Sequence, residues 1–143
     1  MNTACNSYFT GRVFSGVGEG SFYVSLYSKR FLEKLGFKPY PGTLNLRLLE
    51  DIEVFNICLS RANHILIEPP NIPGVRLGAV HAYPAEVEGY FNPSVFIVRP
   101  VITIYKSDVV ELIADTSLRE TLNIRDGHTI RFKIRTMENN KWG

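Results

Sequence analysis

The chain has 143 residues, of which 45% are hydrophobic and 21% are charged, and 16 basic against 14 acidic side chains give a net charge of +2. This length predicts a single domain over residues 1–143 with a core of ordinary size, and the hydrophobic content excludes a disordered chain. The nearly balanced charge argues against nucleic acid as the main partner, and no apolar run approaches the ~20 residues that span a membrane.

The only two cysteines are Cys5 and Cys58, and they lack the C-x-x-C spacing of a zinc or redox site. We therefore expect neither a zinc site nor a disulfide framework, and a reducing cytoplasm is the simplest location. The N-terminus has no basic segment followed by an apolar core, so a signal peptide is not expected.

In the first third of the chain, loose alternation of apolar residues predicts a strand over 8–15, and the apolar run over 22–26 predicts a second strand. Helical spacing within 31–35 predicts a short helix that Gly36 closes as a C-cap. Residues 43–48 alternate polar and apolar side chains, which predicts a strand with one buried face.

The rest of the chain is rich in β-branched and apolar residues. We expect further strands over 64–67, 75–87, 90–98, 109–114 and 128–134. Glu88-Gly89 suits a hairpin turn, and Ser117 with Glu120 forms a capping box at the start of a short helix that ends near Asn123. Many short strands with two small helices favour a closed or nearly closed β-barrel.

The glycine-rich stretch GVGEG, residues 16–20, separates the first two expected strands. Glycine allows positive φ and lets a ligand approach the backbone closely, and successive N–H groups in such a bend can hold an anion. The G-x-x-x-x-G-K-[ST] pattern of a P-loop is absent from the sequence. Two interpretations remain, a phosphate-binding bend and a plain hairpin turn, and the pentapeptide by itself favours the turn.

The stretch PGTLN places Thr43 and Asn45 two residues apart on an expected strand, so both side chains point the same way. A hydroxyl and an amide oxygen can reach one Mg²⁺, which keeps water or substrate phosphates in its remaining positions. The alternative is an exposed polar strand face with no role, and the motif alone favours that alternative.

Three stretches taken together, in this order, resemble the archaeal CTP-dependent riboflavin kinases over nearly the whole chain. They are SGVGEGSFYVSL, LGFKPYPGTLNLRL, and the run from Thr103 through Glu111 to LRETLNIRDGHTIRFKI. The resemblance implies a mainly β fold, a single six-stranded cradle-loop β-barrel with short helices. It also implies transfer of the γ-phosphoryl group of CTP to the 5′-hydroxyl of riboflavin, which gives FMN and CDP.

The same resemblance implies the roles of individual residues. Nucleotide-binding residues would be Gly16, Val17, Gly18, Glu19, Gly20 and Ser21, together with Thr116, Ser117, Leu118 and Arg119. Thr43 and Asn45 would hold Mg²⁺, while Thr103 and Glu111 would contact the flavin. A helix N-terminus near Thr116 agrees with anion binding. Ser21 stands where relatives often carry a basic residue, and Asp115 where a proline is common.

Glu111 is the candidate catalytic base, although a ribityl anchor fits a loose phosphoryl transfer better. The expected ligands are riboflavin or FMN and CTP or CDP, with no nucleic-acid, membrane or obligate protein partner. Two alternatives stay open. The stretch LNIRDGHTIRF also resembles DNA-binding transcription-regulator barrels, and a non-catalytic nucleotide- or flavin-binding module could use the same barrel.

Overall fold

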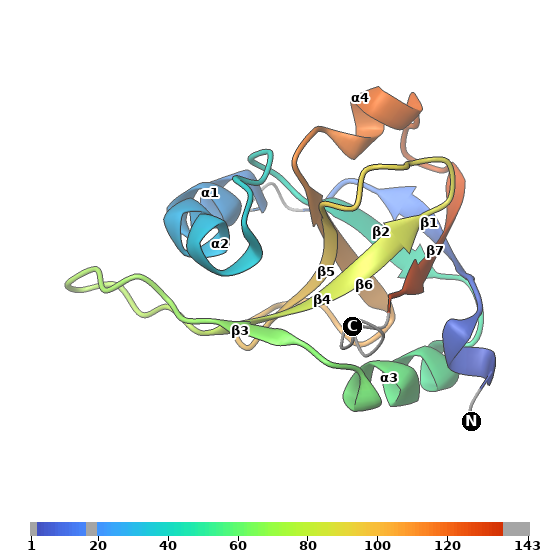
Figure 1. The fold of residues 1–143 in the computed structure, drawn as a ribbon, viewed down its shortest axis with the longest axis horizontal. Coiled ribbons are helices and arrows are strands. Elements are labelled where there is room, and N and C mark those ends of the chain that lie inside the picture. Colours follow the sequence, from blue (N-terminus) through green and yellow to red (C-terminus); the bar gives the residue numbers. More distant parts are fainter. Residues whose placement is uncertain (1–2, 17–19, 136–143) are drawn as a thin grey trace, which may run out of the picture.

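Six antiparallel strands close into a barrel, and a seventh strand extends the sheet beyond it (Figure 1). The computed structural model describes residues 3–16 and 20–135. In sheet order the barrel strands are β4 (Val80–Val87), β5 (Val95–Pro100), β6 (Val109–Ala114), β2 (Leu44–Leu48), β1 (Phe9–Phe14) and β7 (Thr129–Ile134). Since β7 also pairs with β4, the ring is complete, and the predicted six-stranded barrel is confirmed.

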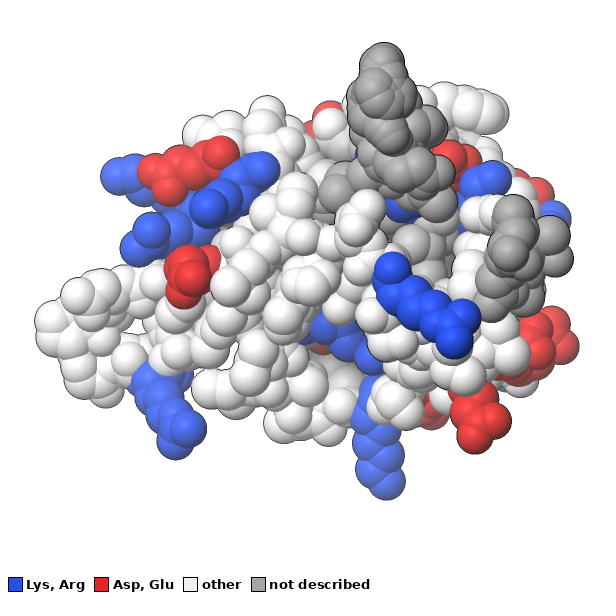
Figure 2. All heavy atoms as spheres, turned by 60° about the horizontal axis from the view of Figure 1, so that its bottom comes forward, with Lys and Arg blue, Asp and Glu red and all other residues white. Residues whose placement is uncertain are grey.

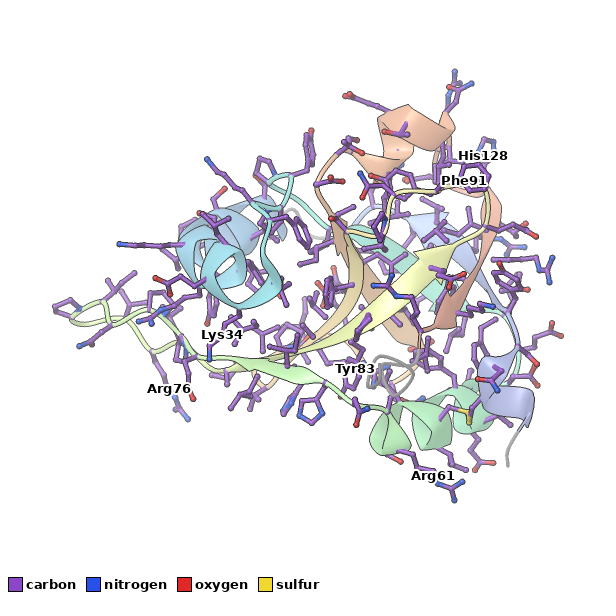
Figure 3. The ribbon with its side chains drawn as sticks, viewed as in Figure 1. Lys34, Arg61, Arg76, Tyr83, Phe91 and His128 are labelled. Carbon is purple, nitrogen blue, oxygen red and sulfur yellow. A yellow bond between two sulfur atoms is a disulfide. The ribbon has the colours of Figure 1, made fainter. Side chains whose placement is uncertain are left out.

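The barrel closes at β4, whose two halves have different neighbours along one edge. Residues 80–82 pair there with β3 (Ile65–Ile67), and residues 85–87 pair with β7. The other edge of β4 pairs with β5 from Val80 to Pro84. The connection between β3 and β4, residues 68–79, projects away from the barrel and carries Arg76 (Figure 3).

Two apolar cores share the wall of the barrel. The larger core fills the interior and includes Leu46, Leu112 and Phe132. The smaller core lies outside the wall, where Val80, Ile113 and their neighbours pack against the first two helices. This double coverage explains why every residue of β6 is buried, whereas β7, with one covered face, alternates between buried and more exposed residues.

Four short α-helices and one 3₁₀ turn surround the barrel. They are η1 (Thr3–Asn6), α1 (Gly20–Leu26), α2 (Ser28–Leu35), α3 (Ile52–Arg61) and α4 (Leu118–Leu122). In Figure 1, α1 and α2 lie beside the barrel, α4 lies above it, and α3 lies below it next to η1. Within residues 3–16 and 20–135, no helix combines the length and the hydropathy needed to cross a membrane.

The prediction of a strand over 22–26 was wrong, because these residues belong to α1. Val24, Tyr27 and Phe31 are all buried, and their spacing of three and four residues places them on one face across α1 and α2. Aromatic and β-branched residues favour strands locally. Here the packing of that face against β4 and β6 stabilises the helix instead of a strand.

Other boundaries differ more modestly from the sequence predictions. β4 begins at Val80 rather than at residue 75, and β5 begins at Val95 rather than at residue 90. Only an isolated bridge between Val87 and Tyr90 marks the expected tight hairpin at Glu88-Gly89. The patterns predicted no element for α3, although Phe55, Cys58 and Leu59 of this helix are buried at helical spacing. The strands predicted over 8–15, 43–48, 64–67, 109–114 and 128–134 are present as β1, β2, β3, β6 and β7.

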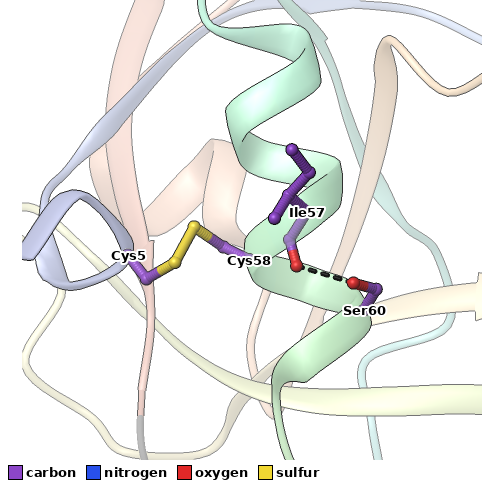
Figure 4. Close-up of a disulfide and its surroundings, with 4 residues drawn as sticks. All are labelled: Cys5, Ile57, Cys58 and Ser60. Atoms are coloured by element: carbon purple, nitrogen blue, oxygen red, sulfur yellow. Dashed lines mark hydrogen bonds between the residues drawn. A yellow bond between two sulfur atoms is a disulfide. The ribbon is translucent and has the colours of Figure 1, made fainter. Parts of the chain in front are cut away.

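Cys5 and Cys58 form a disulfide, so the expectation of two free thiols was wrong (Figure 4). They are 53 residues apart in the sequence, but η1 packs against α3 and brings their Cα atoms to 5.3 Å. Ser60, two residues after Cys58, donates its hydroxyl to the Ile57 carbonyl at 2.7 Å. Rules based on the spacing of nearby cysteines cannot predict a disulfide between elements that are distant in the sequence.

Candidate active site

Two cavities meet at Thr43. The first, called the α1 pocket, has a volume of about 180 Å³. Its walls are α1 with Tyr27, residues 76–78 and Val80, Pro100 with residues 102–105, and the residues Thr43, Asn45 and Glu111. The second, called the α4 pocket, has a volume of about 310 Å³. Its walls are Tyr40, residues 42–44, Leu112, Ala114 and residues 116–120. Because Thr43 lines both, ligands in the two pockets can approach each other at this residue.

Thr43 and Asn45 lie at the start of β2 and contact each other. The Thr43 hydroxyl donates to Asn45 Oδ1 at 2.8 Å. Asn45 was expected on an exposed polar face, but it is only 7% exposed because the α1 pocket lies over this face of the strand. Two neutral oxygens are thus held close together at the junction of the pockets.

The ends of the glycine stretch pack directly on this pair. A Cβ on Gly20 would lie 2.6 Å from Thr43 Oγ1, and a Cβ on Gly16 would overlap Asn45 Nδ2 and the Tyr105 hydroxyl. A side chain at either position would force its neighbours to shift, Thr43 in one case and Asn45 with Tyr105 in the other. Val17, Gly18 and Glu19 lie outside the described residues, and the following Ser21 is an exposed residue of α1.

Glu111 is the cross-strand neighbour of Asn45, since β6 pairs with β2 in the register Asn45 to Glu111. Directly opposed residues have Cβ atoms about 5 Å apart on the same face of a sheet. The Glu111 side chain is almost fully buried, and this burial raises its pKa to about 7, while the nearby Arg99 guanidinium lowers it in part. A carboxyl group that ionises near neutral pH therefore stands beside Thr43 and Asn45.

Thr103 reaches the same pocket from the segment between β5 and β6. It is exposed, and its hydroxyl accepts a hydrogen bond from the Tyr105 backbone N–H at 3.1 Å. The Tyr105 ring packs edge-on against Phe14 with centroids 5.9 Å apart, which joins this segment to the end of β1. The α1 pocket thus brings together Gly20, Thr43, Asn45, Thr103 and Glu111 from the predicted site.

The α4 pocket brings together the second predicted group, Thr116 to Arg119. The Ser117 side chain caps α4 by accepting from the Glu120 N–H at 3.2 Å, which confirms Ser117 as the predicted N-cap. The Thr116 hydroxyl lies 2.7 Å from the Tyr90 hydroxyl, which also donates to Asp115 at 2.9 Å. The connection between β4 and β5 therefore supports the loop that precedes α4.

Arg119 points back to the glycine stretch. Its guanidinium pairs with Asp126 at 2.7 Å and also reaches the Phe14 carbonyl and the Ser15 hydroxyl. Hydrogen bonds from Ser15 and then from Arg119 lower the pKa of Asp126. The family resemblance assigned Arg119 to the nucleotide-binding residues. In the structure it links α4 to the end of β1, where the glycine stretch begins.

Two residues of these pockets were missing from the sequence prediction. Tyr23 lines the α1 pocket, and Tyr90 supports Thr116 at the α4 pocket. Tyr23 was assigned to a strand, and the strand pattern does not indicate that its side chain faces a pocket. Tyr90 had no motif around it. The sequence SFYVSL directly follows GVGEG, and interpreting it as a helix would have drawn attention to Tyr23.

The oxygen-rich site contains few charged ligands for a metal. Among the described residues, no group of three or more His, Cys, Asp or Glu side chains is placed to hold a metal ion. A cation at this site would therefore rely on neutral side-chain oxygens and on a negatively charged ligand.

Comparison with known proteins agrees with this arrangement. The sequence model of the family named CTP-dep_RFKase, described as domain of unknown function DUF120, matches residues 13–134. The chain is 52% identical over 126 residues to a riboflavin kinase of Aeropyrum pernix, which covers 88% of this chain and 94% of that protein.

Two further relatives are longer proteins. A riboflavin kinase of Archaeoglobus fulgidus is 41% identical over 87% of this chain, and one of Pyrococcus abyssi is 38% identical over 94% of it. The matches cover 53% and 62% of these two proteins, so the chain spans little more than half of their length. The family match includes both pockets, and the chain belongs to the CTP-dependent riboflavin kinase family of enzymes.

Proposed function

We propose that this chain transfers the γ-phosphoryl group of CTP to the 5′-hydroxyl of riboflavin. The bond between the γ-phosphorus and the bridging oxygen breaks, a bond to the 5′-oxygen forms, the hydroxyl proton is released, and the products are FMN and CDP. The observation that carries the proposal is that Thr43 lines both cavities, so that a donor and an acceptor can meet there.

The α4 pocket suits the nucleotide, and the α1 pocket suits the flavin. The α4 pocket has loop residues 116–119 on one side and Thr43 on the other. The α1 pocket combines apolar residues with polar groups that include Glu111 and Thr103, as expected for a largely aromatic ligand with a polar chain. The glycine stretch would complete the nucleotide site, because Gly16 and Gly20 contact Asn45 and Thr43.

Thr43 and Asn45 fit a magnesium ion. The Thr43 hydroxyl and Asn45 Oδ1, which lie 2.8 Å apart in a hydrogen bond, are neutral oxygens of the kind that would hold a Mg²⁺ ion together with substrate phosphates. When bound, Mg²⁺ would neutralise charge on the phosphates. The role of the two side chains is to hold the cation where the pockets meet.

Glu111 would anchor the ribityl chain of riboflavin. Phosphoryl transfer through a loose transition state gains little from early removal of the acceptor proton, so positioning is the larger contribution. A general base is the competing role, which a pKa of about 7 would suit. Kinetics of one variant distinguish the two roles, as described in the Discussion.

The location proposed for the enzyme is the cytoplasm, and its partners are the two small-molecule substrates. The Cys5–Cys58 disulfide is compatible with this location, because intracellular proteins of hyperthermophilic archaea often contain disulfides.

For the described residues on the face in Figure 2, positive and negative side chains are interspersed around a wide neutral area. That face offers no continuous positive surface for a DNA backbone.

A kinase assay tests the proposal. Riboflavin is incubated with each of the four nucleoside triphosphates, with magnesium or with EDTA, and FMN and nucleoside diphosphate are separated by chromatography. We expect FMN and CDP in equal amounts with CTP and magnesium, and neither product with EDTA. Riboflavin binding without turnover would assign the chain to the non-catalytic alternative.

A further inference from the structure

The hydroxyl of Tyr23 is buried and has no hydrogen-bond partner among the described residues. The ring is held by edge-on contacts with Tyr27 and Phe31, at centroid distances of 5.4 and 6.5 Å. Tyr27, one helical turn away, donates its own hydroxyl to the Gly78 carbonyl. Two neighbouring tyrosines thus differ in one respect: the Tyr27 hydroxyl has a hydrogen-bond partner, whereas the Tyr23 hydroxyl has none in residues 3–16 and 20–135.

A buried hydroxyl without a partner is unfavourable and uncommon in folded proteins. The hydroxyl of Tyr23 belongs to a residue that lines the α1 pocket, so a bound ligand is the available source of a partner. The ring contacts fix the side chain before the ligand arrives, and little conformational entropy is lost on binding.

Glu111 is a buried charged residue of the same pocket. The pKa of Tyr23 is raised first by burial and then by the negative charge of Glu111. The phenol therefore keeps its proton and can donate, while the carboxylate can only accept. A hydroxyl group both donates and accepts, so one ligand hydroxyl can satisfy both side chains.

The pocket is divided between polar and apolar parts. Phe22, Ile102 and Ile104 line it and are largely exposed, with 69, 54 and 68% of their surface accessible. Glu111 lies instead beside Asn45, at the junction of the two pockets. An aromatic ring system suits the apolar residues, and a polyol chain directed toward the junction suits Glu111 and Tyr23.

We propose that the Tyr23 hydroxyl, together with Glu111, binds a hydroxyl group of the ribityl chain and makes Tyr23 a specificity-determining residue of the α1 pocket. This inference rests on the proposed function, since it assigns the α1 pocket to riboflavin. The Tyr23 contact selects flavins that carry a polyol chain, because a ligand without one offers no hydroxyl group to the buried Tyr23 hydroxyl.

The first test is Tyr23→Phe, which removes the hydroxyl and keeps the ring contacts with Tyr27 and Phe31. We expect the KM for riboflavin to rise about 10-fold, the effect of one lost hydrogen bond, with kcat and the KM for CTP changed less than about twofold. Tyr83→Phe is the matched control, because Tyr83 is a buried tyrosine of β4 that does not line the α1 pocket (Figure 3). An unchanged KM for riboflavin in Tyr23→Phe would overturn the inference.

The second test uses lumiflavin, which carries a methyl group in place of the ribityl chain. Flavin fluorescence titrations give dissociation constants for both ligands with wild type, Tyr23→Phe and Tyr83→Phe. We expect Tyr23→Phe to weaken riboflavin binding about 10-fold and to leave lumiflavin binding unchanged. An equal loss for both ligands would place the Tyr23 contact on the ring system and refute the ribityl assignment.

The two proposals fail in different ways. Wild-type protein that binds riboflavin but makes no FMN would refute the kinase proposal, and the titrations would still decide the role of Tyr23. Wild-type turnover with unchanged Tyr23→Phe kinetics and binding would refute only the role of Tyr23. A wild-type protein that does not bind riboflavin would refute both. Thermal unfolding of each variant shows whether a change in KM accompanies a loss of fold.

Discussion

The two pockets differ in how their polar groups are satisfied. Around the α4 pocket the protein supplies the partners itself: Ser117 caps α4, Thr116 meets Tyr90, and Arg119 pairs with Asp126. In the α1 pocket the Tyr23 hydroxyl has no partner among the described residues, and Glu111 is buried with a raised pKa. The polar groups of the α4 pocket thus have protein partners before any ligand binds. The α1 pocket contains buried polar groups to which a bound ligand would supply hydrogen bonds.

The largest expected effect lies where the pockets meet. The double variant Thr43→Ala with Asn45→Ala should lower kcat/KM about 100-fold or more at limiting magnesium, because both proposed metal ligands are lost. Circular dichroism should show the fold retained, since neither side chain is part of the apolar cores. Thr129→Ala on the exposed side of β7 is the control. Full activity of the double variant would refute the metal assignment.

Glu111→Gln addresses the α1 pocket alone. As a ribityl anchor, Glu111 contributes a charged hydrogen bond, and its loss should raise the KM for riboflavin about 10-fold with kcat little changed. Steady-state kinetics with riboflavin varied at saturating CTP measure both constants. A lower kcat with an unchanged KM would instead identify Glu111 as the general base.

Arg119→Ala addresses the α4 pocket alone. We expect the KM for CTP to rise about fivefold. The variant removes the hydrogen bond between α4 and Ser15, the residue that precedes the glycine stretch. The KM for riboflavin should stay within about twofold of wild type. A change in riboflavin KM equal to that in CTP KM would show that the two pockets are not independent.

The raised pKa of Glu111 also predicts a pH-dependent stability difference. The unfolded carboxyl group ionises near pH 4.5 and the folded one near pH 7, so the folded state retains a proton that the unfolded state has lost. Stability is therefore lost as the pH rises between these values. Glu111→Gln should be more stable than wild type by up to about 3 kcal/mol at pH 8 and by little at pH 4.

Chemical denaturation at several pH values measures this difference, with Glu33→Gln on the exposed surface of α2 as control. A difference between Glu111→Gln and wild type that does not grow with pH would contradict the burial of an ionisable Glu111.

The smallest effect on activity is expected from the disulfide, because α3 lies at the opposite end of the barrel from α4 (Figure 1). Cys5→Ser with Cys58→Ser opens a loop of 53 residues, and the chain-entropy model gives a destabilisation of about 4 kcal/mol. Thermal unfolding should show a clear fall in Tm, while both KM values remain unchanged at 25 °C. A changed KM for either substrate would show that α3 communicates with a pocket.

Local sequence patterns determined a large part of this protein. The sequence alternation in β1, β2 and β7 depends only on which side chains face the barrel interior. The cap at Ser117 and the left-handed Gly36 depend only on hydrogen bonds and φ angles within a few residues. The short motifs GVGEG and PGTLN by themselves favoured a turn and an exposed polar face, and their resemblance to the family, taken with a third stretch, assigned them to the candidate site.

Contacts between distant segments decided the rest. The helical state of residues 22–26 depends on the apolar face that α1 shares with α2 against β4 and β6. The Cys5–Cys58 bond depends on η1 packing against α3. Asn45 and Glu111 became neighbours only through the register of β2 and β6. No window of the sequence contains these pairs, because the free energy that joins them comes from burial of surfaces contributed by separate parts of the chain.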